Sequence, residues 1–209
     1  MPQPRTLKIN EIFYSLQGEG LRQGEPTVFI RFAGCNLKCD FCDTQYAWND
    51  GRNLSVDQIC SEVADMRHLH SSRWICLTGG EPLFQNIASL TQQLKADKWR
   101  IQVETNGIFY KNLPVDWYTV SPKPDEFFVH PKYTDIAKEV KLVVTKELEI
   151  DTIKSMRNKF SKDVPLFLQA QSNMKWSLDR GIELAEKAAE KNLSDVRLSV
   201  QLHKILGLP

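Results

Sequence analysis

The sequence lacks an excess of charge of either sign. Its 209 residues include 27 Lys or Arg and 26 Asp or Glu, which leaves a formal net charge of +1, and neither sign forms a long run. Proteins that bind nucleic acids usually carry a basic patch or tail. The balanced composition therefore argues against a nucleic-acid partner and makes a small molecule the default ligand.

Long apolar runs are also missing. The N-terminal stretch MPQPRTLKIN has no apolar segment typical of a secretory signal. No later stretch approaches the roughly 20 apolar residues of a membrane-spanning helix. We therefore expect no membrane partner and a cytoplasmic location. Since 42% of the residues are hydrophobic, the chain can still bury a core, and we expect residues 1–209 to form a single domain.

Cysteine is scarce, and a fourth clustered cysteine is absent. The chain has five cysteines, an odd number, so without a secretory signal a disulfide framework is improbable. Cys35, Cys39 and Cys42 are separated by three and two residues, within CNLKCDFCDT. We assign Cys60, on a helical apolar stripe, and Cys76, in an apolar strand, to the core. The three clustered thiols are therefore the candidate metal ligands.

Three thiols without a fourth favour an iron–sulfur cluster. A zinc ion that only stabilises a fold normally has four protein ligands, whereas three thiolates on a [4Fe–4S] cluster keep one iron open to a ligand that is not protein. A non-catalytic zinc or iron–sulfur module that binds a partner or carries electrons stays an alternative. Such a module would need a fourth protein ligand.

Short β-rich runs alternate with amphipathic stretches, which is typical of βαβ units and a largely parallel sheet. The expected strands are 27–34, 74–79, 100–106, 117–121, 140–145, 165–171 and 196–200. The expected helices are 55–69, 87–96, 149–160 and one that follows Ser177. A complete eight-fold barrel typically takes about 250 residues. We therefore expect an α/β fold that is an open, partial (β/α) barrel, abbreviated in helices.

Two serines are expected to cap helices. Ser55 precedes the first helix, and Gln58 completes a capping box. Ser177 is expected to cap the last helix, in which Glu183 pairs with Lys187. The expected apolar face of that helix consists of Leu178, Ile182, Ala185 and Ala189.

Polar side chains on apolar strands predict a lined cavity. Arg31 shares a strand face with Phe29 and Ala33, opposite Val28, Ile30 and Phe32. An arginine there pairs either with a structural carboxylate or, four residues before Cys35, with a substrate carboxylate. The same alternation puts further polar residues on strand faces, namely Gln102, Glu104, Lys141, Gln169 and Gln171.

Glycines mark two further segments. Gly79 and Gly80 follow an apolar strand in TGGEP, and they would let backbone groups approach a ligand at the strand's carboxyl end, with Glu81 nearby. The segment QGEGLRQG does not match a dinucleotide-binding fingerprint, because Gly18, Gly20 and Gly24 miss the G-x-G-x-x-G spacing.

The cysteine spacing, with Phe41 directly before the last cysteine, resembles the signature of the radical S-adenosylmethionine (SAM) superfamily. The resemblance implies a [4Fe–4S] cluster whose open iron binds SAM, and reductive cleavage of SAM to a 5′-deoxyadenosyl radical that abstracts hydrogen from a substrate. The GGE segment would then hold the SAM amino group, with Gly80 as the expected contact.

Further segments narrow the resemblance to the 7-carboxy-7-deazaguanine synthase family. They are SLQGEG, FIRFAGCNLKCDFCDT, TGGEP, VETNG, SPK, QAQS and the ending QLHKILGLP. The family resemblance implies conversion of 6-carboxy-5,6,7,8-tetrahydropterin to 7-carboxy-7-deazaguanine, a step toward queuosine-type nucleosides, by hydrogen abstraction at C6, ring contraction and loss of ammonia. It also implies a flavodoxin-like or other electron donor and a homodimer.

The same resemblance assigns residues. The cluster ligands are Cys35, Cys39 and Cys42, and Thr44 falls at a magnesium position, which suits the hard-oxygen preference of Mg²⁺. The expected SAM-binding residues are Phe41, Cys42, Asp43, Gly80, Ser121, Pro122, Lys123, Gln169, Ala170, Gln171 and Ser172. The expected substrate-binding residues are Leu16, Gln17, Gly18, Arg31, Thr78, His203 and Pro209. A glycyl-radical activase stays a further alternative, since it would share the cysteines but would not need Arg31 or SLQGEG.

Overall fold

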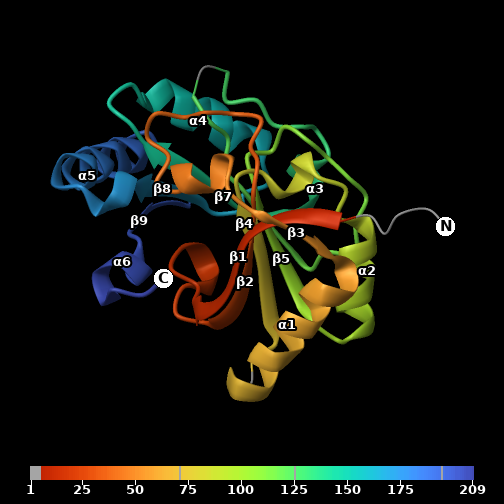
Figure 1. Cartoon of the computed structure of the whole chain (residues 1–209). Coiled ribbons are helices and arrows are strands. Elements are labelled where there is room, and N and C mark those ends of the chain that lie inside the picture. Colours follow the sequence, from red (N-terminus) through yellow and green to blue (C-terminus); the bar gives the residue numbers. More distant parts are fainter. Residues whose placement is uncertain (1–5, 71, 125, 194) are drawn as a thin grey trace.

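The computed structural model describes residues 6–70, 72–124, 126–193 and 195–209, and within them nine strands form one sheet. The strand order is β3-β1-β2-β4-β5-β6-β7-β8-β9, and β3 and β9 are its two free edges. From β2 onward all neighbouring strands are parallel. The sheet is curved and open (Figure 1), so the expected partial barrel is confirmed.

The seven parallel strands correspond to the seven expected from the sequence. They are β2 Pro26–Phe32, β4 Trp74–Gly79, β5 Arg100–Thr105, β6 Trp117–Val120, β7 Ala137–Val144, β8 Leu166–Ala170 and β9 Val196–Ser199. Parallel strands lie under helices on one face, which explains why apolar runs identified them.

Two antiparallel strands were not expected, β1 (Thr6–Leu16) and β3 (Arg52–Ser55). Strand β1 pairs with both β2 and β3, and its register against β2 shifts between Ile9 and Glu11. The shift is a β-bulge, which moves the inward side chains from odd to even positions. The period-2 pattern of β1 is therefore broken in the middle, and β3 is short and mostly polar.

Four helices cover one face of the sheet, and the connections between the middle strands are abbreviated (Figure 1). The covering helices are α1 Val56–His70, α2 Ala88–Ala96, α4 Ile150–Lys159 and α5 Lys175–Glu190. In the described residues the connection from β5 to β6 has no helix, and that from β6 to β7 has only α3, Tyr133–Ile136. The short helix α6, Leu202–Leu206, follows β9.

The first expected helix cap is confirmed. The Ser55 Oγ accepts from the Gln58 N–H at 3.2 Å, and the Gln58 Oε1 accepts from the Ser55 N–H at 2.8 Å. This is a capping box, which satisfies two backbone donors that the helix itself leaves open.

The prediction for the start of the last helix is wrong. Helix α5 begins at Lys175, and Ser177 lies inside it, where its hydroxyl donates to the Val144 carbonyl at 2.8 Å and accepts from the Gln171 N–H at 2.8 Å. The predicted apolar face is also wrong, since Ile182 is 47% exposed. The buried residues are Ser177, Gly181, Leu184 and Ala188. The Glu183–Lys187 pair is confirmed at 2.6 Å.

Strand β2 shows how the fold separates a core from a cavity. Val28, Ile30 and Phe32 are fully buried in the core under the helices. Phe29 and Arg31 point to the opposite face, where they line a cavity. The alternation predicted from the sequence is therefore confirmed.

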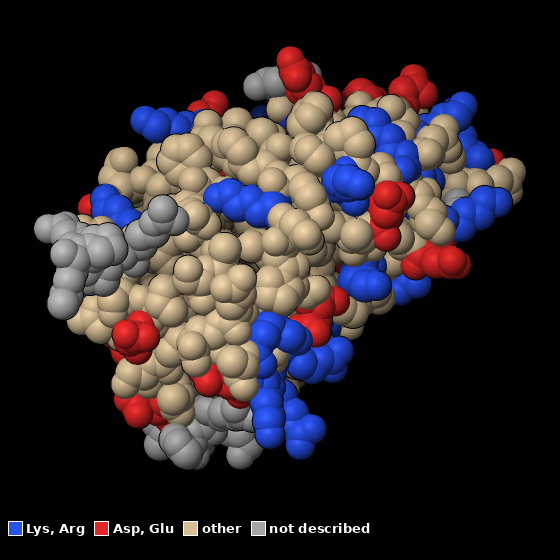
Figure 2. All heavy atoms as spheres, turned by 90° about the vertical axis from the view of Figure 1, so that its right-hand side faces the viewer, with Lys and Arg blue, Asp and Glu red and all other residues tan. Residues whose placement is uncertain are grey.

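The molecular surface agrees with the balanced composition. On the face shown in Figure 2, Lys and Arg are interspersed with Asp and Glu over most of the described surface, and one small group of Lys and Arg lies at the lower centre of the view. None of the helices in the described ranges is both long and apolar enough to cross a bilayer.

Candidate active site

A cavity of about 230 Å³ lies where the carboxyl ends of the parallel strands meet. This is where parallel α/β folds bind ligands. The fold brings nearly all of the predicted site residues to this cavity, and Pro122 is the exception. Those that line it are Leu16, Gln17, Gly18, Arg31, Cys35, Cys39, Phe41, Cys42, Asp43, Thr44, Thr78, Gly80, Ser121, Lys123, Gln169, Ala170, Gln171, Ser172, His203 and Pro209.

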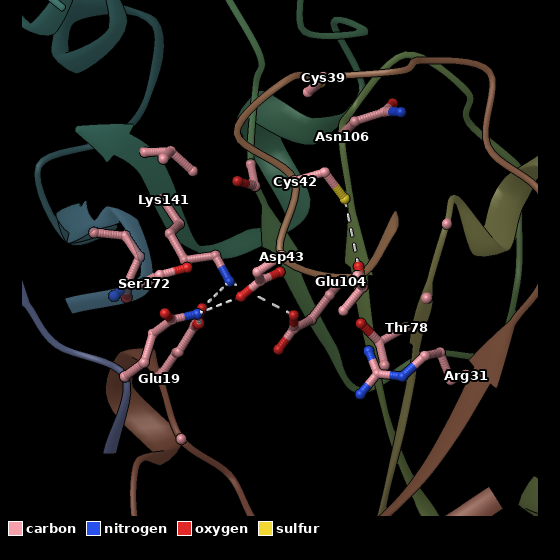
Figure 3. Close-up of a pocket in the computed structure, with 18 of the residues that line it drawn as sticks. Glu19, Arg31, Cys39, Cys42, Asp43, Thr78, Glu104, Asn106, Lys141 and Ser172 are labelled. Atoms are coloured by element: carbon pink, nitrogen blue, oxygen red, sulfur yellow. Dashed lines mark hydrogen bonds and ion pairs between the residues drawn. The ribbon is translucent and has the colours of Figure 1, made fainter. Parts of the chain in front are cut away.

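The three clustered cysteines line the cavity from the loop after β2, and Figure 3 labels two of them, Cys39 and Cys42. The Cys42 N–H donates to the Cys39 carbonyl at 3.0 Å, and the Cys35 Sγ accepts from the Leu37 N–H at 3.4 Å. The Cys42 Sγ lies 3.5 Å from the Thr44 Oγ1. Burial raises the pKa of the Cys35 thiol. We call the segment Cys35–Thr44, together with Gly79–Glu81, the cysteine side.

The three clustered thiols line one cavity, but they do not converge on a single point. In the described ranges no three His, Cys, Asp or Glu side chains converge on one point that could hold a single metal ion. No disulfide joins any of the five cysteines, all of which are described. Three thiols lining one cavity match the number of protein ligands of a [4Fe–4S] cluster with one open iron, whereas structural zinc normally has four protein ligands.

The other two thiols are elsewhere. Cys76 is fully buried in β4, and burial raises its pKa well above the usual value. Cys60 packs against the core from α1, and burial raises its pKa to about 11. Both were expected in the core, and neither lines the cavity.

Gly79 and Gly80, at the end of β4, let this backbone approach the backbone at the end of β2. A Cβ on Gly79, whose φ is +125°, would lie 2.3 Å from the Phe32 carbonyl oxygen, and one on Gly80 would lie 2.0 Å from that of Gly34. The Gly80 N–H donates to Phe32 and the Glu81 N–H donates to Gly34, at 3.0 and 2.9 Å. The glycines therefore fasten the cysteine loop to β4, a role that sequence reasoning had not given them.

Glu81 completes this attachment from below the cavity. Its buried carboxylate accepts from the Leu83 N–H at 3.0 Å, the Thr105 hydroxyl at 2.9 Å and the Asn106 N–H at 2.7 Å. The Asn106 amide donates onward to the Asn36 Oδ1 at 2.9 Å, within the cysteine loop. Burial raises the pKa of Glu81, although the donors oppose the shift. Glu81 thus holds a loop and a strand end in place.

The opposite side of the cavity is charged. Lys141 on β7 bonds to the Glu19 carboxylate and lies 3.5 Å from that of Glu104. Burial alone would lower the pKa of Lys141, but Glu104 and Glu19 reverse the shift and raise it. Burial would raise the pKa of Glu19, and Lys141 lowers it instead. We call Glu19, Glu104, Lys141 and Gln201 the charged side (Figure 3 shows the first three).

A second polar layer below the cavity fixes the segment SLQGEG. The Glu139 carboxylate accepts from the Leu21 N–H and the Thr119 hydroxyl, both at 2.7 Å. It also occupies the space that a Cβ on Gly20 would need, at 2.5 Å, and Gly20 has a φ of +68°. Gly20 is therefore required because the buried Glu139 carboxylate leaves no room for a side chain, and no bound phosphate is needed to explain this glycine.

Arg31 points into the cavity toward Thr78 (Figure 3). Its Nε donates to the Glu11 carboxylate at 2.6 Å, so a structural carboxylate is present, as one reading of the sequence allowed. The Tyr46 hydroxyl donates to the same carboxylate at 3.1 Å. Because Glu11 does not line the cavity, it holds the guanidinium from behind and leaves the remaining N–H groups of Arg31 facing the cavity.

The segment after β9 closes the cavity between its two sides, where Figure 1 shows α6 beside the turn between β1 and β2. The Leu202 N–H donates to the Gly18 carbonyl at 2.9 Å. A Cβ on Gly18 would lie 2.0 Å from the His203 Nδ1, so this glycine makes room for the imidazole. Burial lowers the pKa of His203.

Several lining residues were not predicted as site residues, namely Phe13, Glu19, Phe29, Leu37, Trp48, Gly79, Glu104, Thr105, Asn106, Lys141, Val143 and Gln201. Alternation had pointed to Glu104 and Lys141, but it gave them no role. Glu19 lies inside SLQGEG and Gln201 begins the last quoted segment, so position within these motifs was the available signal.

Comparison with known proteins agrees with this geometry. The model of the Radical SAM superfamily matches residues 29–200. The chain is 35% identical to "7-carboxy-7-deazaguanine synthase" of Rickettsia prowazekii over 97% of this chain and 88% of that protein. It is 33% identical to the protein of that name from Aquifex aeolicus, over 97% and 94%. The chain belongs to the 7-carboxy-7-deazaguanine synthase family of radical SAM enzymes.

The solved structures agree with this membership. The crystal structure of QueE from Escherichia coli has a TM-score of 0.77 and 27% identity, and the match covers 95% of both chains. SuiB from Streptococcus suis, at 14% identity and a TM-score of 0.58, shares the fold alone. As a radical SAM enzyme, this protein uses a [4Fe–4S] cluster and SAM as cofactors. The alternatives of a non-catalytic module and a glycyl-radical activase are not favoured.

Proposed function

We propose that this chain converts 6-carboxy-5,6,7,8-tetrahydropterin to 7-carboxy-7-deazaguanine, by hydrogen abstraction at C6, ring contraction and loss of ammonia. The observation that carries the proposal is one cavity in which three thiols face Arg31, Glu104 and Lys141, in a chain that matches the named relatives over almost its full length. Residues 1–209 would act as a single radical SAM domain.

The cysteine side would hold the cofactors. Cys35, Cys39 and Cys42 fit as the three cluster ligands, and when bound the cluster and SAM supply the 5′-deoxyadenosyl radical that takes hydrogen from the substrate. The Thr44 hydroxyl would contribute one oxygen to a Mg²⁺ ion that otherwise takes oxygens from substrate and water. The SAM contacts would come from Phe41, Asp43, Gly80, Ser121, Pro122, Lys123, Gln169, Ala170, Gln171 and Ser172.

The rest of the cavity would bind the pterin. The exposed edge of the Arg31 guanidinium suits a carboxylate, because its parallel N–H groups match the two oxygens. Partly buried acceptors such as Glu104 suit the amino and ring N–H groups of a pterin, which would lose water on binding. Leu16, Gln17, Gly18, Thr78, His203 and Pro209 would complete the contacts, and enclosure by the last segment would exclude water from a reactive radical.

The proposal extends to partners and location. A flavodoxin-like protein or another one-electron donor would reduce the cluster, and two copies would form a homodimer. A cytoplasmic location is supported by cysteines that form no disulfide, because thiols persist in a reducing compartment.

The test is anaerobic reconstitution with iron and sulfide, followed by dithionite, SAM, Mg²⁺ and the carboxylated pterin. We expect a brown protein that forms the deazaguanine product, identified by mass, and SAM that is regenerated at each turnover. Cleavage of SAM without dependence on the pterin would contradict the substrate, and absence of a cluster would contradict the cofactor assignment.

Arg31→Ala sharpens this test. Losing a charge-assisted bidentate contact should raise the KM for the carboxylated pterin by about tenfold or more, while iron content stays at the wild-type level. Arg52→Ala is the matched control, since Arg52 is 53% exposed and pairs with Glu62 away from the cavity. Loss of iron from Arg31→Ala would mean that the side chain is structural.

A further inference from the structure

Two residues of the segment QLHKILGLP, to which neither the sequence analysis nor the proposed function gives a role, join the two sides of the cavity. The Gln201 Nε2 donates to the Glu19 Oε1 at 2.8 Å and to the Asp43 Oδ2 at 2.9 Å. The Lys204 Nζ donates to the same Asp43 oxygen at 2.9 Å and to the Ser172 hydroxyl at 2.9 Å. Asp43 lies between Cys42 and Thr44, so these bonds reach the middle of the cysteine side.

The orientation of the Gln201 amide follows from its partners. Carboxylates only accept hydrogen bonds, so both N–H donors of the amide must face Glu19 and Asp43. The Gln201 Oε1 is left buried without a hydrogen-bond partner among the described residues. Leaving a buried acceptor without a hydrogen bond is unfavourable. The two carboxylates therefore fix the orientation of the Gln201 amide, although its oxygen makes no hydrogen bond in that orientation.

The segment that carries these residues is anchored independently of them. Its backbone bonds to Gly18, and the Asn173 side chain bonds to both the N–H and the carbonyl of Gln201, each at 2.8 Å. Removing the Gln201 amide or the Lys204 amine would therefore leave the segment attached. The two side chains are thus separable from the fold of the segment around them.

We propose that Gln201 and Lys204 are positioning residues that form a clasp, through which the segment after β9 fixes the Asp43 carboxylate and couples the cysteine loop to the Glu19 loop. The Gln201 amide bridges the Glu19 and Asp43 carboxylates, which would otherwise repel each other, while Lys141 pairs with Glu19 and Lys204 with Asp43. The clasp sets the position of the loop that runs from Cys42 to Thr44 before any substrate binds. It is expected to act on SAM binding and on the coupling of SAM cleavage to substrate.

The clasp is tested first without catalysis, by hydrogen exchange of the protein before and after reconstitution. In Gln201→Leu and Lys204→Met, we expect backbone exchange in residues 36–48 and 17–25 to increase about tenfold, as for the loss of about 1.4 kcal/mol. Lys204→Arg should restore wild-type exchange. Increased exchange confined to residues 200–209 would overturn the proposal, because the segment would then stabilise only itself.

The second readout depends on the proposed function. We expect both variants to keep wild-type iron content, to raise the KM for SAM by about tenfold and to release more 5′-deoxyadenosine per molecule of product. Lys175→Met is the matched control, since Lys175 is 87% exposed and pairs with Asp179 on the same helix α5. Wild-type KM and coupling in both variants would overturn the clasp. A wild-type protein that does not convert the pterin would instead contradict the proposed function, with the exchange result unaffected.

Discussion

The two sides of the cavity are built in different ways. The cysteine side is held mostly by backbone, since Gly79 and Gly80 let one strand end approach the next, and the N–H groups of Gly80 and Glu81 donate to the Phe32 and Gly34 carbonyls. The charged side is held by side chains, with Lys141 between Glu19 and Glu104. On the cysteine side, the Glu81 carboxylate adds side-chain hydrogen bonds to these backbone contacts. On the charged side, the Gln201 amide donates to Glu19.

The difference suits the ligands expected on each side. A metal cluster needs its ligands at fixed positions, and backbone contacts between glycines allow little displacement. A polar substrate needs donors and acceptors that are already desolvated, which buried ion pairs provide at a cost in stability. The cysteine side should therefore respond mainly to added volume, and the charged side to removed charge.

Lys141→Met is expected to have the largest effect. It leaves Glu19 and Glu104 without their cation, and removing one partner of a buried ion pair costs about 3–5 kcal/mol. Thermal unfolding under anaerobic conditions would measure the loss, with Lys175→Met as an exposed control within about 0.5 kcal/mol of wild type. A small loss for Lys141→Met would mean that water already solvates the charged side.

Gly80→Ala should follow, and it should act on the cluster. The added Cβ would lie 2.0 Å from the Gly34 oxygen and 3.1 Å from the Cys35 Cβ, so the cysteine loop must move. Such overpacking costs about 1–3 kcal/mol. Iron retained after reconstitution would measure the displacement. Gly24→Ala is the control, because its φ of +87° strains an alanine but no atom lies within 4 Å; equal iron loss in both variants would contradict a local steric effect.

Glu81→Gln is expected to have the smallest effect of the three, about 1–3 kcal/mol, because one of its donors loses an acceptor. Burial raises the pKa of Glu81 above its usual value of 4.5. A carboxyl with a higher pKa in the folded state stabilises the fold when protonated, and this contribution is lost as the pH rises through the folded pKa. The stability lost in the variant should therefore be larger near about pH 5 than near about pH 7. A loss independent of pH would contradict the sign of this shift.

The parallel part of the fold could be predicted because each of its strands follows one pattern along its whole length. Strand β1 could not, because its bulge between Ile9 and Glu11 changes the inward face halfway. Ser177 was misassigned because a serine hydroxyl can cap a helix. In the structure Ser177 lies inside α5, and its hydroxyl bonds to the Val144 carbonyl on strand β7. Local sequence does not contain that partner.

The candidate site also has one part that could be predicted from the sequence and one part that could not. The cysteine triplet and the GGE segment are contiguous in sequence, so spacing and resemblance were enough to place them in one cavity. The charged side joins residues that are 122 positions apart in the case of Lys141 and Glu19, and 182 in the case of Gln201 and Glu19. Pairings of this kind follow from the folded sheet and its last segment. The roles assigned to the individual residues stay predictions.

The placement of the two remaining cysteines has a practical consequence. Cys76 is sealed in the core, and burial raises the pKa values of both Cys76 and Cys60, so at neutral pH neither carries much of the thiolate that an alkylating reagent attacks. Cys35, Cys39 and Cys42 are half-buried, as is Cys60, but they line a cavity that a small reagent can enter, although burial also raises the pKa of Cys35. Alkylation of this protein would therefore serve as a titration of how many molecules in a preparation carry their inorganic centre.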